Sequence, residues 1–339
     1  MNTAQVRIAI LGFWHVHAKD FVRDARAEPG VEIVAGWDAD AGFGRTAAEA
    51  LDVPFTDDLD ALLAREDVDG VVVTTETTRH GEVIPAALRA GKHVITEKVL
   101  APTRAEAEDL ARLAAARDRV LHVSLFRLAH GSTRAIREQI GAGAVGMPTH
   151  ARVRVAHDGA VASETHPEGW LPARFYDPAA AGGGATIDLG AHPLYLLRTF
   201  LGMPEVVQAV FGEMTGRGVE DHSVVTLRYP NGALAVAETG FVSAGPYTSI
   251  EIDGTRGNLL LSPVDGLLRV RTAPGGAWEV VEVPEDGPIP FRQWLALLPG
   301  RVSDPENLAA AIDLSALAEA VAASAATMRA VRLNGGSSE

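Results

Sequence analysis

Three ionisable side chains in this sequence have the types and the spacing needed to move a proton. Lys98 follows Glu97 directly after a short apolar stretch, while Asp188 and His192 lie four residues apart in a largely apolar segment. A four-residue spacing places two side chains on one face of a helix. Burying such groups is costly unless they have partners or a task. A substrate hydroxyl between Lys98 and His192 would supply the task, because an amine or an imidazole can exchange its proton.

Structural roles are the alternative explanation for the same residues. Lys98 and Glu97 could form an ordinary ion pair at the surface. Asp188 and His192 could be a buried pair whose members satisfy each other by hydrogen bonding. No metal is expected, because no third ligand is evident beside this pair and the chain contains no cysteine.

A glycine turn near the N-terminus indicates a dinucleotide site, though weakly. Residues 9–18 have the pattern of a strand, a turn at Gly12 and a helix. In the G-x-G-x-x-G fingerprint, such a turn and the helix N-terminus hold a pyrophosphate. Trp14 and His17 stand where the second and third glycines would be. A plain strand–turn–helix is therefore the alternative.

Asp38 strengthens the case for a dinucleotide, because it ends the second predicted strand. A carboxylate at that place accepts hydrogen bonds from the adenosine ribose and repels a 2′-phosphate, so NAD is expected in preference to NADP. No arginine follows Asp38 directly, and Arg45 is the one reservation. The alternative is an aspartate that caps the next helix.

The elements that must position these residues differ between the two halves of the chain. Residues 1–125 alternate apolar strands with helices, which predicts a doubly wound parallel sheet. The carboxyl ends of such strands border a ligand crevice, and Gly12, Asp38 and Lys98 each follow a predicted strand. The strands are predicted at Val6–Leu11, Val31–Trp37, Val53–Phe55, Val68–Thr74, His93–Thr96 and Val120–Ser124.

Residues 126–333 have strands in which polar and apolar side chains alternate, typical of an antiparallel sheet with one open face. We therefore predict a second, α+β domain with a large, mainly antiparallel sheet. It also contains one apolar helix from Ala185 to Leu201, kinked at Pro193, and a long helix over Pro305–Val331. Residues 334–339 are expected to be a disordered tail. Strands are predicted at Thr149–Ala156, Glu205–Glu213, Ser223–Tyr229, Ala233–Phe241, Thr248–Asp253, Asn258–Leu261, Leu267–Thr272 and Trp278–Val283.

Length and composition limit the class of protein. The 339 residues are enough for two domains, and 47% hydrophobic with 22% charged residues is typical of a globular chain. The net charge of −14, without a cluster of basic residues, argues against a nucleic-acid partner. No signal-peptide pattern opens the chain and no uncharged apolar run is long enough for a membrane span. We expect a cytoplasmic protein without a membrane partner.

Four segments in their order resemble the Gfo/Idh/MocA family of NAD(P)-dependent oxidoreductases, which includes glucose–fructose oxidoreductase and inositol dehydrogenase. They are Ala90–Lys98, Gly182–His192, Val219–Gly232 and Ile252–Gly257. The resemblance extends over nearly the whole chain, and the four motifs are specific only when taken together. It implies a Rossmann domain over 1–125 followed by an α/β domain whose open sheet often forms homodimers or homotetramers.

The resemblance also implies an activity. Such an enzyme transfers a hydride between NAD(H) and a hydroxyl-bearing carbon of a sugar, polyol or sugar acid. Lys98 and His192 would handle the proton, with Asp188 beside them. The residues expected to bind the dinucleotide are Gly12, Phe13, Trp14, His15, Asp38, Thr74, Thr75, His80, Glu97 and Lys98.

The expected substrate contacts are aromatic or polar residues of the second domain, because aromatic rings can stack on a sugar while polar groups bind its hydroxyls. They are Arg127, His157, Trp170, Tyr176 and Tyr195, each of which could equally be structural. Trp14, His17 and Val99 depart from the family pattern, the last by replacing the usual proline after the lysine.

Two other functions remain open on the same scaffold. One is a redox-neutral glycosidase that keeps NAD bound, as some relatives of the family do. The other is a non-catalytic sensor of NAD or a sugar, although the retained Lys98, Asp188 and His192 argue against it. Net formation of NADH with polyols would support the dehydrogenase, and hydrolysis of an aryl glycoside without NADH would support the glycosidase.

Overall fold

The computed structural model describes residues 5–245 and 247–333, which form two compact units. The first unit combines residues 1–125 with 288–312, and the second combines 126–287 with 313–339. The boundary after residue 125 is shared with the predicted domains, but 288–312 groups with the first unit. The reason is helix α10 (Pro290–Leu297), whose Phe291 and Trp294 are buried in the core of that unit. The predicted tail, 334–339, lies outside the described residues.

The first unit contains the predicted parallel sheet, with strand order β2-β1-β3-β4-β5. Its strands are β1 (Val6–Leu11), β2 (Val31–Trp37), β3 (Gly70–Val73), β4 (His93–Thr96) and β5 (Leu121–Val123). Because β1 and β3 are buried on both faces, they consist almost entirely of apolar residues. The strand predicted at Val53–Phe55 is wrong. That segment makes only a single bridge between Gly36 and Phe55, and Pro54 has no N–H to extend it.

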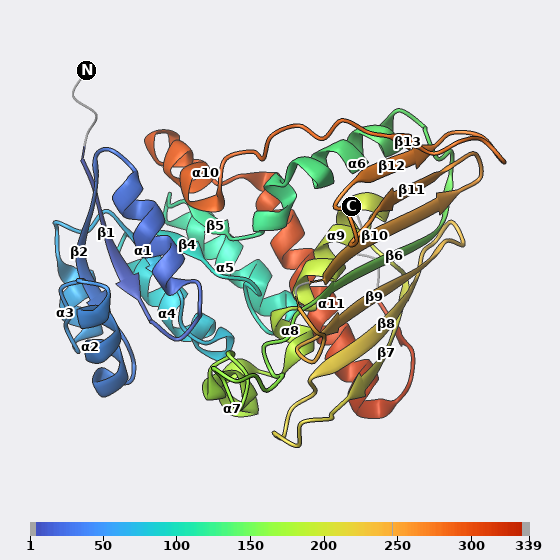
Figure 1. Cartoon of the computed structure of the whole chain (residues 1–339). Helices are drawn as coiled ribbons and strands as arrows, with labels where there is room; N and C mark the ends of the chain where they lie inside the picture. The colour runs from blue at the N-terminus through green and yellow to red at the C-terminus, as the bar shows by residue number, and fades with distance from the viewer. Residues whose placement is uncertain (1–4, 246, 334–339) are drawn as a thin grey trace. The chain divides into compact units, whose positions relative to one another are not determined.

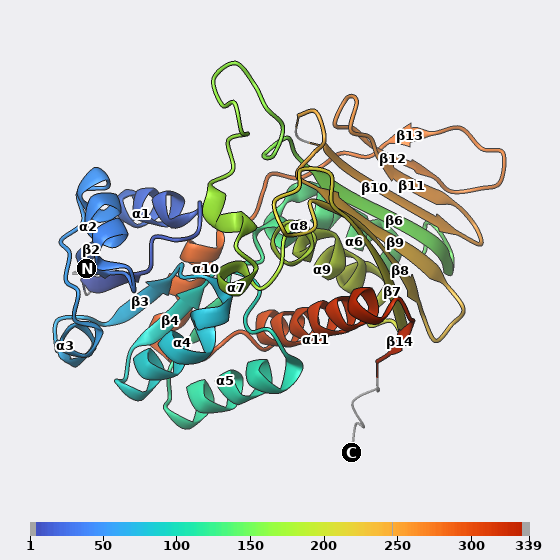
Figure 2. The same cartoon turned by 90° about the horizontal axis from the view of Figure 1, so that it is seen from below.

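Helices cover both faces of this sheet. The chain runs from β1 outward to β2 and then back across to β3, β4 and β5, so right-handed crossovers place α1 opposite α4 and α5. Figure 2 shows this arrangement, in which α10 packs with α1 and α4 packs with α5. The helices are α1 (Ala18–Ala27), α2 (Ala41–Ala50), α3 (Leu59–Ala64), η1 (Thr77–Arg79), α4 (His80–Arg89), α5 (Arg104–Ala116) and η4 (Leu298–Gly300).

The second unit is built on a mixed, mainly antiparallel sheet with strand order β13-β12-β11-β10-β6-β9-β8-β7-β14, as predicted. The neighbours β6 and β9 are parallel to each other. In Figure 1, helices of this unit cover one face of the sheet and leave the other face bare. The strands are β6 (Pro148–Ala156), β7 (Val206–Gly212), β8 (His222–Arg228), β9 (Leu234–Gly240), β10 (Tyr247–Gly254), β11 (Asn258–Leu261), β12 (Leu268–Arg271), β13 (Glu279–Val280) and β14 (Val331–Arg332).

The helical layer of the second unit includes α9, which packs against the central strands β6 and β9. The helices are η2 (Phe126–Ala129), α6 (Gly131–Gly141), η3 (Ala173–Tyr176), α7 (Pro178–Ala181), α8 (Ala185–Asp188), α9 (Ala191–Leu201) and α11 (Pro305–Thr327), the last of which begins in the first unit. The apolar helix predicted from Ala185 to Leu201 is therefore two helices. The helix predicted to reach Val331 ends at Thr327, and Val331 and Arg332 form strand β14, which pairs with β7.

Helix α11 has the length and the mean hydropathy, 1.5, that a membrane span requires, and half of its apolar window is buried inside the protein. Two polar side chains show how it packs there. Asp313 forms an ion pair with Arg198 on α9, at 2.8 Å, and Ser324 Oγ accepts a hydrogen bond from the backbone of β7. These contacts are those of a core helix.

Candidate active site

The glycine turn after β1 is held tightly by its neighbours. Gly12 has a φ of +88°, and a Cβ atom added to it would lie 2.6 Å from the backbone nitrogen of Thr75. Only glycine fits this position, because it lacks a Cβ and adopts positive φ without strain. Phe13 buries its ring in the core near Gly36, so only its backbone is available at the turn.

Asp38 is buried at the end of β2 and turned toward that loop. One carboxylate oxygen accepts the backbone N–H of Phe13 at 2.7 Å, and the other accepts that of Asp40 at 2.9 Å. Burial raises the pKa of Asp38, and the two N–H donors act against that rise. Each oxygen retains a lone pair for a further donor. Arg45 does not contact this carboxylate, since it pairs with Asp57 and lies over the ring of Phe55.

Two buried threonines, Thr74 and Thr75, follow β3 directly and lie beside the same turn. Thr74 donates its hydroxyl to the carbonyl oxygen of Gly12 at 2.5 Å, and its own carbonyl accepts the N–H of His15. The hydroxyl oxygen of Thr75 is buried and has no hydrogen-bond partner among the described residues. Buried polar atoms are seldom left unpaired, so this hydroxyl is available to a ligand.

His80 begins α4 and is 1% exposed. Its Nδ1 lies 3.0 Å from the carbonyl oxygen of Val99, so Nδ1 carries the proton and donates it. Burial lowers the pKa of His80 to about 4, and the ring is neutral. The other ring nitrogen, Nε2, is buried without a partner among the described residues and can accept a hydrogen bond from a ligand.

Glu97 follows β4 and is 2% exposed. One carboxylate oxygen lies 3.2 Å from His17 Nδ1, and the rings of His15 and His17 are 4.6 Å apart. Burial by itself would raise the pKa of Glu97, but His15, His17 and Lys98 outweigh it and lower the pKa to about 2. Ligand atoms of His15, His17 and Glu97 lie within 4.8 Å of one another, an arrangement that could hold a metal ion. No local pattern in the sequence predicts this cluster.

Lys98 is 3% exposed at the carboxyl end of β4, where the backbone N–H of Lys98 donates to the carboxylate of Glu97. The lysine is therefore no surface residue, which removes the surface ion pair as its explanation. The peptide bond to Val99 is cis, and Val99 is fully buried.

These features fit a bound dinucleotide. The Gly12 turn, the oriented carboxylate of Asp38, the unpaired hydroxyl of Thr75 and the unpaired Nε2 of His80 all belong to the carboxyl ends of β1, β2 and β3 and the segment after them. That edge of an open parallel sheet is where dinucleotides bind. Of the predicted cofactor residues, the structure brings these together with Glu97 and Lys98.

In the second unit, Asp188 ends α8 and His192 stands near the start of α9. The break between the helices has a physical cause in Pro193, which has no N–H to donate to the carbonyl of Leu189. The N–H of His192 takes that place, at 3.1 Å. Both residues between the helices keep right-handed helical angles, so the distortion is local. His192 is 3% exposed.

Tyr195 orients His192. Its hydroxyl lies 2.9 Å from His192 Nδ1 and accepts the backbone N–H of Arg127 at 3.3 Å. The ring of Phe126 packs edge-on against the imidazole at 5.1 Å. Tyr195, predicted to bind substrate, is fully buried, and its hydroxyl serves the imidazole.

Glu220 holds the segment that carries Asp188, a role that the sequence analysis missed. Its carboxylate accepts the backbone N–H groups of Gly184 and Thr186, both at 3.0 Å, at the start of α8. Its carbonyl accepts the N–H of Ala185. Because Glu220 is far from Gly184 and Thr186 in the sequence, no local pattern predicts these hydrogen bonds, although Glu220 stands in a segment that resembles the family.

Three of the remaining predicted substrate residues, His157, Trp170 and Tyr176, form an aromatic group with Phe241. The ring of His157 stacks on Phe241 at 5.0 Å and lies 4.8 Å from the ring of Trp170. Trp170 is 43% exposed and donates Nε1–H to Asp158. Tyr176 contacts the edge of Phe241 and is buried. Trp170 is thus the exposed aromatic surface of this group.

Comparison with known families and proteins identifies both units. Residues 6–125 match the family model described as "Oxidoreductase family, NAD-binding Rossmann fold", and residues 133–260 match the model "GFO/IDH/MocA C-terminal domain". The chain is 31% identical to 1,5-anhydro-D-fructose reductase of Ensifer adhaerens over 72% of each chain. It is also 31% identical to dTDP-3,4-didehydro-2,6-dideoxy-alpha-D-glucose 3-reductase of Streptomyces antibioticus, over 84% of this chain and 86% of that protein.

Solved structures share the fold at lower identity. GenD2 from gentamicin A biosynthesis, in complex with NAD, matches with a TM-score of 0.82 and 24% identity, over 99% of this chain and 98% of that one. Levoglucosan dehydrogenase, in complex with NADH and levoglucosan, matches with a TM-score of 0.80 and 20% identity, over 97% and 99%. These likenesses support the two-part architecture.

Proposed function

The chain belongs to the Gfo/Idh/MocA family of NAD-binding oxidoreductases, and on that premise we propose that it transfers a hydride between NAD(H) and a hydroxyl-bearing carbon of a sugar, polyol or sugar acid. One observation carries the proposal. A lysine, Lys98, is almost completely buried at the carboxyl end of β4, beside the carboxylate of Glu97. A buried amine at the ligand edge of this sheet suits proton exchange with a substrate hydroxyl.

The first unit would hold the dinucleotide through the groups already aligned at its strand ends. Asp38 would accept the ribose hydroxyls, Thr75 would donate its hydroxyl, and His80 Nε2 would accept a hydrogen bond. Because the Asp38 carboxylate would repel a 2′-phosphate and Arg45 is paired elsewhere, we propose NAD rather than NADP. When bound, the nicotinamide supplies the hydride acceptor, and the protein supplies alignment.

The second unit would contribute His192 and Asp188. In this proposal Lys98 or His192 takes the hydroxyl proton as the hydride leaves, and gives it back in the reverse direction. Tyr195 is a positioning residue, because its hydroxyl holds His192 Nδ1 and so fixes the orientation of the imidazole. Asp188 would bind a second hydroxyl or orient the imidazole. That Lys98 and His192 meet over one substrate stays a prediction of the sequence.

The substrate class follows from the relatives and from the aromatic group. The relatives from Ensifer adhaerens and Streptomyces antibioticus are named for sugar substrates. The scyllo-inositol 2-dehydrogenase (NAD(+)) of Bacillus subtilis, 24% identical over 82% of this chain and 80% of that protein, is named for a cyclic polyol. The exposed face of Trp170, supported by His157, would stack on a sugar ring. Arg127 and Tyr176 would be further substrate contacts.

A panel of sugars, polyols and sugar acids tests the proposal. The absorbance of reduced cofactor should rise with at least one member when NAD is supplied, and more slowly with NADP. Hydrolysis of an aryl glycoside without net reduction of NAD would favour the redox-neutral glycosidase instead. Binding of NAD and a sugar without turnover would favour the sensor.

The bare face of the second sheet is proposed as the contact between copies of the chain. Val210, Val224 and Leu234 are 66%, 41% and 52% exposed on β7, β8 and β9. A homodimer or homotetramer would cover these apolar side chains. Light scattering should give a mass above that of one chain, and Val224→Glu should lower it. A cytoplasmic location is part of the same proposal and can be checked by cell fractionation.

A further inference from the structure

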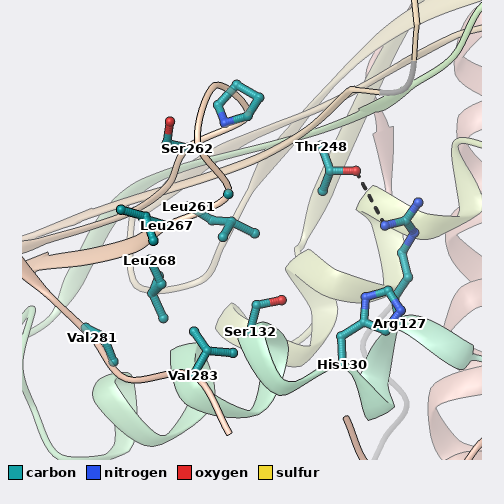
Figure 3. Close-up of a pocket in the computed structure, with 12 residues that line it drawn as sticks. Arg127, His130, Ser132, Thr248, Leu261, Ser262, Leu267, Leu268, Val281 and Val283 are labelled. Carbon is teal, nitrogen blue, oxygen red and sulfur yellow. Dashed lines mark hydrogen bonds between the residues drawn. The ribbon is translucent and has the colours of Figure 1, made fainter. Parts of the chain in front are cut away.

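A cavity of about 540 Å³ lies wholly within the second unit, between the sheet and the start of α6. We call it the Arg127 pocket. Its twelve lining residues include Arg127, His130, Thr248, Leu261, Leu268 and Val283. Figure 3 shows the arginine and Thr248 at one end and the leucines and valines at the other. The volume is in the range of small-molecule sites.

The charged end contains an arginine without an acidic partner. Arg127 Nε is buried and makes no hydrogen bond to any described residue, and the guanidinium reaches only Thr248 Oγ1, at 3.5 Å. The guanidinium also lies 5.3 Å from the centre of the Phe126 ring. By contrast, Arg152 and Arg198 of the same unit each pair with a carboxylate. A buried charge without a counter-charge is expensive, so a role in binding would explain why it is kept.

The surroundings of Arg127 favour an anion. Burial lowers the pKa of Arg127, yet an arginine stays protonated in proteins. His130 stands at the N-cap position of α6 without a side-chain capping bond, and the N–H groups of a helix start favour negative charge. The nearby acid, Asp286, is engaged by the N–H of Gly131 at 2.7 Å, and none of the twelve lining residues is acidic. Since the chain carries a net charge of −14, an anion would be held here by local groups alone.

We propose that the Arg127 pocket binds a small organic anion, with its carboxylate or phosphate at Arg127 and its apolar body against Leu261, Leu268 and Val283. This deepens the proposed function, in which Arg127 is a substrate contact, and the binding test below does not depend on turnover. The pocket includes Arg127 but not His157, Trp170, Tyr176 or Tyr195, the other residues predicted to bind the sugar. The anionic group can belong to the substrate itself or to a separate molecule, and the chemistry that recognises it is the same.

Calorimetry on the full chain without dinucleotide tests the site independently of turnover. Hexanoate should bind at least about tenfold more tightly than its neutral amide, hexanamide, because the positively charged guanidinium binds a carboxylate more strongly than a neutral amide. Inorganic phosphate should bind as well. Equal affinity for hexanoate and hexanamide, or no binding of either anion, would overturn the proposal.

Matched variants locate the binding. Arg127→Gln should weaken hexanoate at least about tenfold, with a melting temperature equal to or above that of the wild type, because a buried uncompensated charge is removed. Arg137→Gln removes the same charge from the exposed face of α6 and should change affinity by less than about twofold. Equal losses in the two variants would mean surface electrostatics and contradict the site.

Two further variants keep the test decisive. Thr248→Val removes the hydroxyl beside Arg127 at nearly constant volume, and it should weaken both anions even where Arg127→Gln fails to fold. Val283→Trp, at a position 40% exposed, should fill the apolar end and weaken hexanoate while phosphate still binds. If all variants bind hexanoate as the wild type does, the pocket is not the site.

The effect of hexanoate on turnover distinguishes the two sources of the anionic group. If hexanoate raises KM, the anionic group belongs to the substrate; if hexanoate changes kcat, it belongs to a separate effector.

Discussion

The two units hold their reactive groups by different means. In the first unit, Asp38, Thr74 and Glu97 stand at the ends of parallel strands, and backbone N–H or C=O groups fix each of them. In the second unit, His192 is fixed by the side chain of Tyr195, and the helix before it by the side chain of Glu220. A site on strand ends follows from the fold, whereas a site held by side chains depends on single residues. Substitutions should therefore act differently in the two units.

The largest effect is expected at Lys98. Lys98→Ala should lower kcat by about 10²-fold or more while NAD binding and the melting temperature change little, because proton exchange is the role proposed for this amine. Steady-state kinetics and NAD titration would measure the two properties. Lys98→Arg is the matched control, since it keeps the charge but cannot release its proton, and it should be as inactive as the alanine variant. Unchanged turnover in Lys98→Ala would remove the lysine from the mechanism.

The glycine turn should be the next most sensitive position. Gly12→Ala would place a Cβ atom 2.6 Å from the Thr75 backbone at a φ of +88°, so we expect the free energy of unfolding to fall by roughly 2–3 kcal/mol. If the turn shifts to relieve this contact, we expect weaker binding of NAD instead. Gly81→Ala in α4 is the control, because nothing lies within 4 Å of its added Cβ. Urea unfolding should show that variant as stable as the wild type or up to about 1 kcal/mol more stable. A Gly12→Ala protein with normal stability and NAD affinity would mean that the turn is looser than described.

His80 should make the stability of the protein depend on pH. Its pKa is about 4 in the fold and 6.5 in the unfolded chain. Below pH 6.5 the unfolded chain therefore binds a proton that the folded protein refuses, and stability falls as the pH falls toward 4. From pH 6.5 to 5 this amounts to at most about 2 kcal/mol. Urea unfolding of His80→Gln should show a smaller fall over that window, and an unchanged fall would mean that His80 is not the cause.

The smallest effect is expected at Tyr195, although it tests the second unit most sharply. Tyr195→Phe leaves the N–H of Arg127 and Nδ1 of His192 without their partner, which should cost about 1–2 kcal/mol of stability. A merely structural role would stop there. A positioning role also predicts a kcat about 5- to 10-fold lower and a shift of the pH profile of kcat, with KM little changed. Tyr229→Phe, at another buried tyrosine, is the control for stability alone.

The comparison also explains what the sequence could predict. Apolar runs that end in Gly12, Asp38 and Lys98 predict both the parallel sheet and the edge where its ligand binds, since local patterns encode them. The sequence predicts a kink at Pro193. In the structure the helix is broken between Asp188 and Ala191, because the N–H that Pro193 lacks would have bonded in the preceding turn. Three features could not be predicted, because they arise where segments distant in the sequence meet and no local pattern encodes them. They are the contacts of Glu220, the cluster of His15 and His17 with Glu97, and the position of Arg127 without an acidic partner among the described residues.

The central claim is that this chain oxidises a hydroxyl group at the expense of NAD, with Lys98 exchanging the proton. The most direct measurement is the initial rate of cofactor reduction over a panel of sugars, polyols and sugar acids, run in parallel with the wild type and Lys98→Ala. We expect reduction of NAD by at least one substrate in the wild type and a rate about 10²-fold lower in the variant. Equal rates in the two proteins, or hydrolysis of a glycoside with no net NADH, would contradict it.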